Sequence, residues 1–188
     1  MKKDFYIKNM VCNRCIKVLK DELEKQNIEL LKIELGYLQL NITNDDEIET
    51  LKEIVESNGF LLITSAEEKL TEKVKTILIE KLQQLPLNLS TNLSSYLAEH
   101  LGFEYSKISK IFSTTEGKTI EKYFIKLKIE KVKELIQAKQ NNFTEMAQLL
   151  DYSHINHLSG QFKSETGMSL SQYKLQQENY RKPLDQII

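Results

Sequence analysis

"LAEHLGFEYSKISKIFSTTEGKTIEKY", at residues 97–123, is followed by a diverged second version of itself, "MAQLLDYSHINHLSGQFKSETGMSLSQY", at residues 146–173. The two stretches align with an offset of 49 residues at first, and one residue more from the middle onward. The aligned pairs are Ala98 and Ala147, Leu101 and Leu150, Ile108 and Leu158, Phe112 and Phe162, Gly117 and Gly167, and Tyr123 and Tyr173. An internal repeat of this kind predicts one structural unit built twice.

Each copy has the pattern of a helix, a tight turn and a second helix. Gly102 marks the turn of the first copy, Asp151 takes that place in the second, and Gly117 and Gly167 end the second helices. These features predict two helix-turn-helix motifs, at about 92–117 and 143–167.

The segment between the copies, about 118–140, has no glycine or proline and carries a stripe of apolar residues at helical spacing. Some 20 residues in a helix form a rod of about 30 Å. Successive major-groove faces of B-DNA lie about 34 Å apart. A linker helix of this length therefore favours two recognition helices that enter adjacent grooves of one duplex.

Residues 75–174 resemble the DNA-binding domain of the AraC (arabinose-regulator) family. The resemblance rests on the two motifs, on the endings "IFSTTEGKT" and "QFKSETGMS", on the long linker and on the final "YK". It implies a sequence-specific transcription regulator that is not an enzyme. The implied partners are double-stranded operator DNA and RNA polymerase.

The resemblance also assigns candidate DNA contacts by position. In the first copy these are Ser106, Lys107, Ser109, Lys110 and Lys118, and in the second they are Ile155, Asn156, Ser159 and Lys163. Lys110 stands where the family usually has arginine, whereas the second copy has Gly160 there. We therefore expect the second copy to bind mainly through phosphate contacts and DNA shape, with Asn156 as its best candidate for a base contact.

The first 64 residues have a different pattern, in the order strand, helix, strand, strand, helix, strand. The strands are expected at 4–8, 28–35, 37–42 and 60–63, and the helices follow Cys15 and the acidic run at 44–46. This order is the ferredoxin-like βαββαβ unit. The chain is thus expected to be α+β, with a βαββαβ domain at 1–64 and an all-α domain at 65–188.

Cys12 and Cys15 lie in the first strand-to-helix turn of that unit, within "NMVCNRC". A helix N-terminus stabilises a thiolate, and two thiolates on one loop can bind a single soft ion. A metal site, a redox pair and two buried thiols all remain open on this evidence.

The front unit resembles the heavy-metal-associated, copper-chaperone-like domain, in which two such cysteines bind the metal. By this resemblance Cys12 and Cys15 are ligands of Cu(I) or another soft metal, and Asn9 stands where that family commonly has glycine. Two alternative functions are a metal-transfer protein whose helical part docks on another protein, and, less favoured, a thiol-disulfide enzyme.

Charge and hydropathy add broader expectations. Residues 1–65 have 9 basic and 12 acidic side chains, against 17 and 15 in the rest of the chain. We expect a cytoplasmic protein without membrane contact, because no signal-peptide pattern or membrane-length apolar run is present. The sequence leaves open the oligomeric state and the role of the tail 175–188, whose apolar residues suit either docking on the domain or a partner surface.

Overall fold

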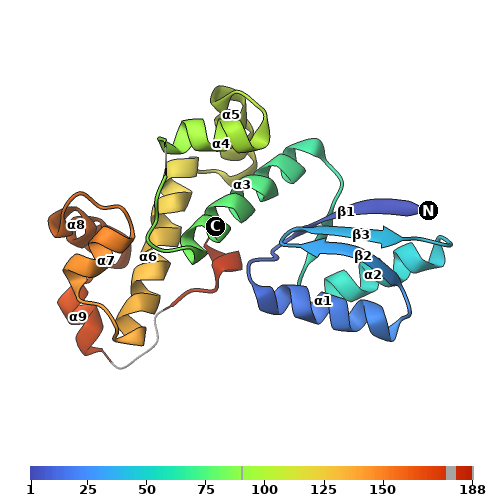
Figure 1. Cartoon of the computed structure of the whole chain (residues 1–188), viewed down its shortest axis with the longest axis horizontal. Coiled ribbons are helices and arrows are strands. Elements are labelled where there is room, and N and C mark those ends of the chain that lie inside the picture. The colour runs from blue at the N-terminus through green and yellow to red at the C-terminus, as the bar shows by residue number, and fades with distance from the viewer. Residues whose placement is uncertain (90, 177–180, 188) are drawn as a thin grey trace. The chain divides into compact units, whose positions relative to one another are not determined.

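The computed structural model describes residues 1–89, 91–176 and 181–187. It divides into two compact units, Met1–Thr76 and Ile77–Ile188 (Figure 1). This division falls inside helix α3 (Ala66–Gln83), whereas the sequence places the domain boundary at 64/65.

The first unit has the predicted βαββαβ order. Its elements are β1 (Lys2–Lys8), α1 (Asn13–Lys25), β2 (Glu29–Glu34), β3 (Tyr37–Asn41), α2 (Asp46–Ser57) and β4 (Leu61–Ile63). The four strands form an antiparallel sheet in the order β2-β3-β1-β4, and α1 and α2 cover one face of it (Figure 1). The fold class expected from the sequence is confirmed.

Alternation along the strands places the core of this unit. Ile7, Leu38 and Leu40 are fully buried, and they pack in one cluster with Leu19 of α1 and Leu51 of α2. Successive strand side chains point to opposite faces, so these residues share the face that the two helices cover. Met10, just before the cysteines, is buried in the same cluster.

Tyr6 lies on the other face of the sheet. Its ring is approached by the ammonium groups of Lys69 and Lys73, at 4.9 and 5.4 Å from the ring centroid. Gly36, with φ +74°, lies where an added Cβ would stand 3.3 Å from the Thr76 hydroxyl. The first half of α3 is therefore part of this unit.

The second unit contains the repeat. Its helices are α4 (Leu93–Leu101), α5 (Tyr105–Glu116), α6 (Ile120–Ala138), α7 (Phe143–Leu149), α8 (Ile155–Thr166) and α9 (Leu170–Leu175), followed by a short 3₁₀ turn, η1 (Leu184–Gln186). Two helix-turn-helix motifs joined by a long linker helix, α6, were expected, and the structure has them (Figure 1). At 19 residues, α6 is about 28 Å long.

The two turns explain the one-residue shift in the alignment. Gly102 and Asp151 both adopt the left-handed conformation, at φ 69° and 59°. Gly102 stands two residues before its N-cap, Glu104, whereas Asp151 stands three before its N-cap, His154. The second copy therefore has a turn that is one residue longer, and its recognition helix is displaced by one position in the sequence.

Two long-range contacts lie within this unit; the first was not expected, and the second is one of the two alternatives that the sequence left open for the tail. The backbone N–H of Leu87 donates to the carbonyl of Leu149 at 2.7 Å, so the segment after α3 pairs with the end of α7. In the tail, residues 181–187 dock on α6, and Ile187 is only 4% exposed. Residues 177–180 and 188 of the predicted tail lie outside the described residues.

Candidate nucleic-acid interface

The two recognition helices, α5 and α8, are anchored in the same way. Phe112 of α5 and Phe162 of α8 are fully buried. Each ring packs on a tyrosine from the next helix, Tyr123 at 5.6 Å and Tyr173 at 5.4 Å between centroids. Because both helices bury the equivalent side, both present the equivalent opposite side to solvent.

The exposed side of α5 carries basic and hydroxyl groups. Ser106, Lys107 and Lys110 are exposed as predicted, whereas Ser109 is half-buried. Lys118, also half-buried, lies just beyond the C-terminal end of the helix. The predicted residues of the first copy thus lie together on α5 and just beyond its C-terminal end. All of their positive charge comes from lysines.

Phe103 is a surface residue that the sequence pattern did not single out. It is 43% exposed, and the Lys107 ammonium lies 4.5 Å from its ring centroid. The sequence could have pointed to Phe103, because it lies between Gly102 and the N-cap Glu104, and a large apolar side chain is unusual in a turn. Cation–π contact restricts where the Lys107 side chain points.

The exposed side of α8 is less charged. Asn156 and Lys163 are exposed, and Ile155 and Ser159 are half-buried. An added Cβ at Gly160 would meet no atom within 4 Å, so open space lies beside the helix at the position equivalent to Lys110.

His157, equivalent to Lys107, is also exposed. Its Nδ1 lies 2.8 Å from the Ser153 hydroxyl, so this ring is held against the turn. The second copy therefore offers an amide, an imidazole and one lysine where the first offers two lysines on the helix.

A hydrogen bond joins α5 to the linker helix in the first copy. The Tyr105 hydroxyl donates to the Glu121 carboxylate. Burial and this carboxylate raise the pKa of Tyr105 above its ordinary value. Burial acts to raise the pKa of Glu121, but the hydrogen bonds from Tyr105, from its own backbone N–H and from Thr119 together outweigh it and lower that pKa.

The second copy has a neutral hydrogen bond at a different position, between the turn and its recognition helix. The Tyr152 hydroxyl donates to the Gln161 side-chain carbonyl at 2.5 Å. The ammonium of Lys128 lies 4.6 Å from the centroid of the Tyr152 ring. Burial raises the pKa of Tyr152 to about 12 and lowers the pKa of Lys128.

Cys12 and Cys15 are brought together in the first unit, as the sequence predicted. Cys12 is the N-cap of α1, Cys15 lies in its first turn, and their sulfurs are 3.6 Å apart. Partial burial acts to raise the pKa of Cys12, but hydrogen bonds from Cys15 and Arg14 outweigh it and lower that pKa. Burial raises the pKa of Cys15.

The geometry of the pair suits a soft metal ion. Two metal–sulfur bonds of about 2.3 Å at a tetrahedral angle separate the sulfurs by about 3.8 Å. Asn9 has φ 75°, in the left-handed region that glycine favours. Within residues 1–89, 91–176 and 181–187, no group of three or more His, Cys, Asp or Glu side chains is placed to hold a metal.

Comparison with known proteins bears on the second unit. The helix-turn-helix domain family matches residues 97–176. No curated protein matches the chain. Among the described residues, no helix is both long and apolar enough to cross a membrane.

Two solved structures are similar to the chain. The C-terminal domain of AraT, a response regulator from Geobacillus stearothermophilus, is 19% identical, with a TM-score of 0.51 over 63% of this chain and 95% of that one. The C-terminal domain of the two-component response regulator yesN from Fusobacterium nucleatum is 22% identical, with a TM-score of 0.48 over 55% and 95%. The first of these likenesses shows the fold of the helical part.

The family match begins inside α4, covers α5, the whole of α6 and the second motif, and does not extend to residues 1–96. Residues 97–176 therefore form a helix-turn-helix domain, whose fold is similar to that of the AraT C-terminal domain.

Proposed function

We propose that this chain regulates transcription by placing α5 and α8 in adjacent major grooves of a double-stranded operator. The observation that carries this proposal is the shared anchoring of the two helices on either side of a 19-residue linker. A linker of about 28 Å is close to the spacing of about 34 Å between successive major-groove faces.

The predicted contact residues take two roles in this proposal. On α5, Ser106, Lys107, Ser109 and Lys110 face the base edges, and Lys118 contacts a phosphate. On α8, Asn156 is the base-reading side chain and Lys163 contacts a phosphate. Ile155 and Ser159 form part of the helix surface that fits the shape of the groove. RNA polymerase is the further partner through which operator binding would alter transcription.

The test is footprinting of the full chain on genomic DNA fragments, followed by affinity measurements on the protected site over a range of salt concentrations. Protection of two segments one helical turn apart, with affinity that falls steeply as salt rises, is the expected result. A single protected segment would contradict the use of both motifs, and binding indifferent to salt would contradict phosphate contact.

We further propose that Cys12 and Cys15 bind Cu(I) or another soft metal ion, and that this binding changes the affinity of the chain for its operator. The close sulfurs, the lowered pKa of Cys12 and the helix N-terminus support it. Helix α3 begins in the first unit and ends in the second. A change in packing around its first half can therefore be transmitted along the helix to the second unit.

Operator affinity with and without Cu(I) tests this input, in the wild-type chain and in a Cys12→Ser/Cys15→Ser variant. We expect Cu(I) to change the affinity of the wild-type chain alone. Equal affinities in all four measurements would exclude sensing by the pair and leave operator binding intact.

A further inference from the structure

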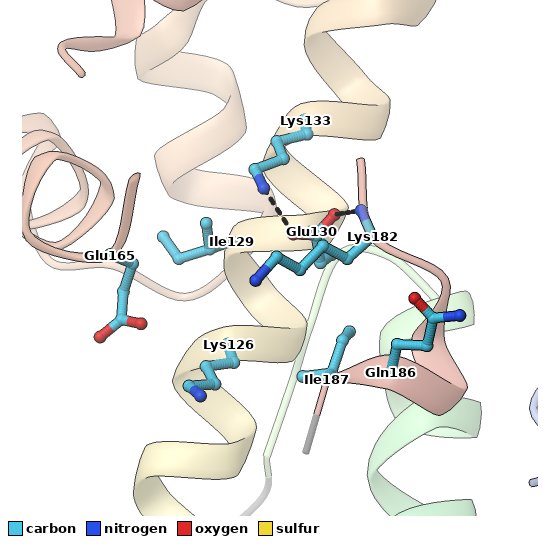
Figure 2. A pocket seen from close by; sticks show the side chains of 8 residues that line it. All are labelled: Lys126, Ile129, Glu130, Lys133, Glu165, Lys182, Gln186 and Ile187. Atoms are coloured by element: carbon cyan, nitrogen blue, oxygen red, sulfur yellow. Dashed lines mark hydrogen bonds and ion pairs between the residues drawn. The ribbon is translucent and has the colours of Figure 1, made fainter. Parts of the chain in front are cut away.

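A pocket of about 130 Å³ lies between the linker helix and the tail of the second unit (Figure 2). One wall is α6, with Lys126, Ile129, Glu130 and Lys133, and the other is the tail, with Lys182 and Ile187. The pocket is small beside the roughly 300–1,000 Å³ of drug-sized ligand sites. Its size suits a molecule of a few heavy atoms.

The tail wall is held in place by contacts other than the side chain of Lys182. The backbone N–H of Lys182 donates to Oε2 of Glu130 at 2.9 Å. The Arg181 guanidinium pairs with Glu134 at 3.2 Å, and Ile187 is 4% exposed. The lysine side chain can therefore be altered without removing the contacts that dock the tail.

The carboxylate at the floor of the pocket is already neutralised. Oε1 of Glu130 accepts from the Lys133 ammonium at 2.5 Å, and Oε2 accepts from the tail (Figure 2). Glu130 and Lys133 are 5% and 6% exposed. A buried carboxylate with both oxygens engaged offers little to an incoming cation.

Two other ammonium groups of the lining are available. Within the described residues, the side chains of Lys126 and Lys182 have no hydrogen-bond or ion-pair partner. Glu165, at the rim, is the other acidic residue of the lining, and it is exposed. Ile129 and Ile187 add two buried apolar side chains beside these charges.

We propose that this pocket binds a small organic carboxylate, whose anionic end lies between Lys126 and Lys182 and whose short apolar body packs on Ile129 and Ile187. This site is separate from the recognition-helix surfaces and from the cysteine pair. Its test uses DNA-free protein, so its failure leaves the proposed operator binding untouched.

The probe is sodium butyrate, titrated into the full ¹⁵N-labelled chain and followed by amide chemical shifts at constant ionic strength. n-Butylammonium chloride, with the same apolar body and the opposite charge, is the matched control. We expect saturable shifts from butyrate, centred on the amides of Ile129 and Ile187, and at least tenfold weaker binding of butylammonium. Shifts centred elsewhere, or equal binding of the two ions, would overturn the proposal.

The double variant Lys126→Gln/Lys182→Gln tests the two charges. It keeps the tail's backbone hydrogen bond to Glu130, and we expect it to weaken butyrate binding at least tenfold. Lys122→Gln, an exposed change on the same helix that does not line the pocket, should bind butyrate like the wild type. A double variant that binds as tightly as Lys122→Gln would exclude the assigned role of the two lysines.

Discussion

The two helix-turn-helix copies have nearly the same interior and different surfaces. Phe112 and Phe162 are both fully buried against a tyrosine, and Gly117 and Gly167 both end their helices in the left-handed conformation. On the exposed side, Lys110 of the first copy is matched by Gly160 of the second. The two copies therefore share the side chains that pack inside and differ in the side chains that face solvent.

If both helices enter the grooves of an operator as proposed, the two copies would contribute unequally to binding. The lysines of α5 supply charge that attracts phosphates and guanine edges. On α8 the equivalent position is Gly160, which carries no charge and has open space beside it, and Asn156 is exposed on the same helix.

The first prediction concerns the shared interior. Phe112→Ala and Phe162→Ala should each lower the free energy of unfolding by about 3–5 kcal/mol, because each leaves a cavity in a closed core. Urea denaturation of the full chain, followed by circular dichroism, measures both. Lys122→Ala is the exposed control, and strongly unequal losses for the two phenylalanines would show that the cores are not equivalent.

The second concerns the unequal surfaces. Lys107→Ala/Lys110→Ala should weaken operator binding by about 1–3 kcal/mol, roughly 10- to 100-fold, since it removes both cations from the exposed side of α5. Fluorescence anisotropy with a labelled operator measures the change. His157→Ala, at the position equivalent to Lys107, should weaken operator binding less. A loss of affinity as large as that of the lysine pair would contradict the larger role assigned to α5.

The third concerns the hydrogen bonds that brace each copy. Tyr105→Phe should cost about 1–3 kcal/mol of stability at neutral pH, because it removes a bond to a carboxylate. The lowered pKa of Glu121 means that this stabilisation is present above the ordinary glutamate pKa and is lost as pH falls through the lowered value. Denaturation at a series of pH values down to that range measures it.

Tyr152→Phe is the matched control for this prediction. Its partner, Gln161, is neutral, so the cost of this substitution should not change over the same acidic range. A cost of Tyr105→Phe that stays constant as pH falls would contradict the role of the Glu121 charge.

The fourth and smallest effect comes from filling the open space beside Gly160. Gly160→Lys should raise helix stability by about 1 kcal/mol and strengthen duplex binding, because it replaces a helical glycine and adds a cation in free space. Thermal denaturation and duplex titration measure the two effects. Gly167→Lys, at φ 75°, should instead destabilise the chain, and a gain there would undermine the argument from backbone conformation.

Much of the candidate interface could be predicted from the sequence, since the repeat places its buried phenylalanines and terminal glycines by local spacing. The exposure of Lys107, Lys110 and Asn156 follows from their position opposite those phenylalanines. The half-buried state of Ser109 and Ser159 could not be predicted, because it depends on how neighbouring helices pack.

The two architectures and the closeness of Cys12 to Cys15 followed from the sequence alone, because period, turn residues and short-range spacing are local properties of the chain. The position of the tail, by contrast, depends on the folded chain. Lys182 and Ile187 reach α6 from about 50 residues away, and the partners that meet them, Glu130 and the linker's apolar side, are selected by packing and burial of charge. Such contacts leave no periodic trace in the sequence, so the pocket they enclose becomes visible only in the folded chain.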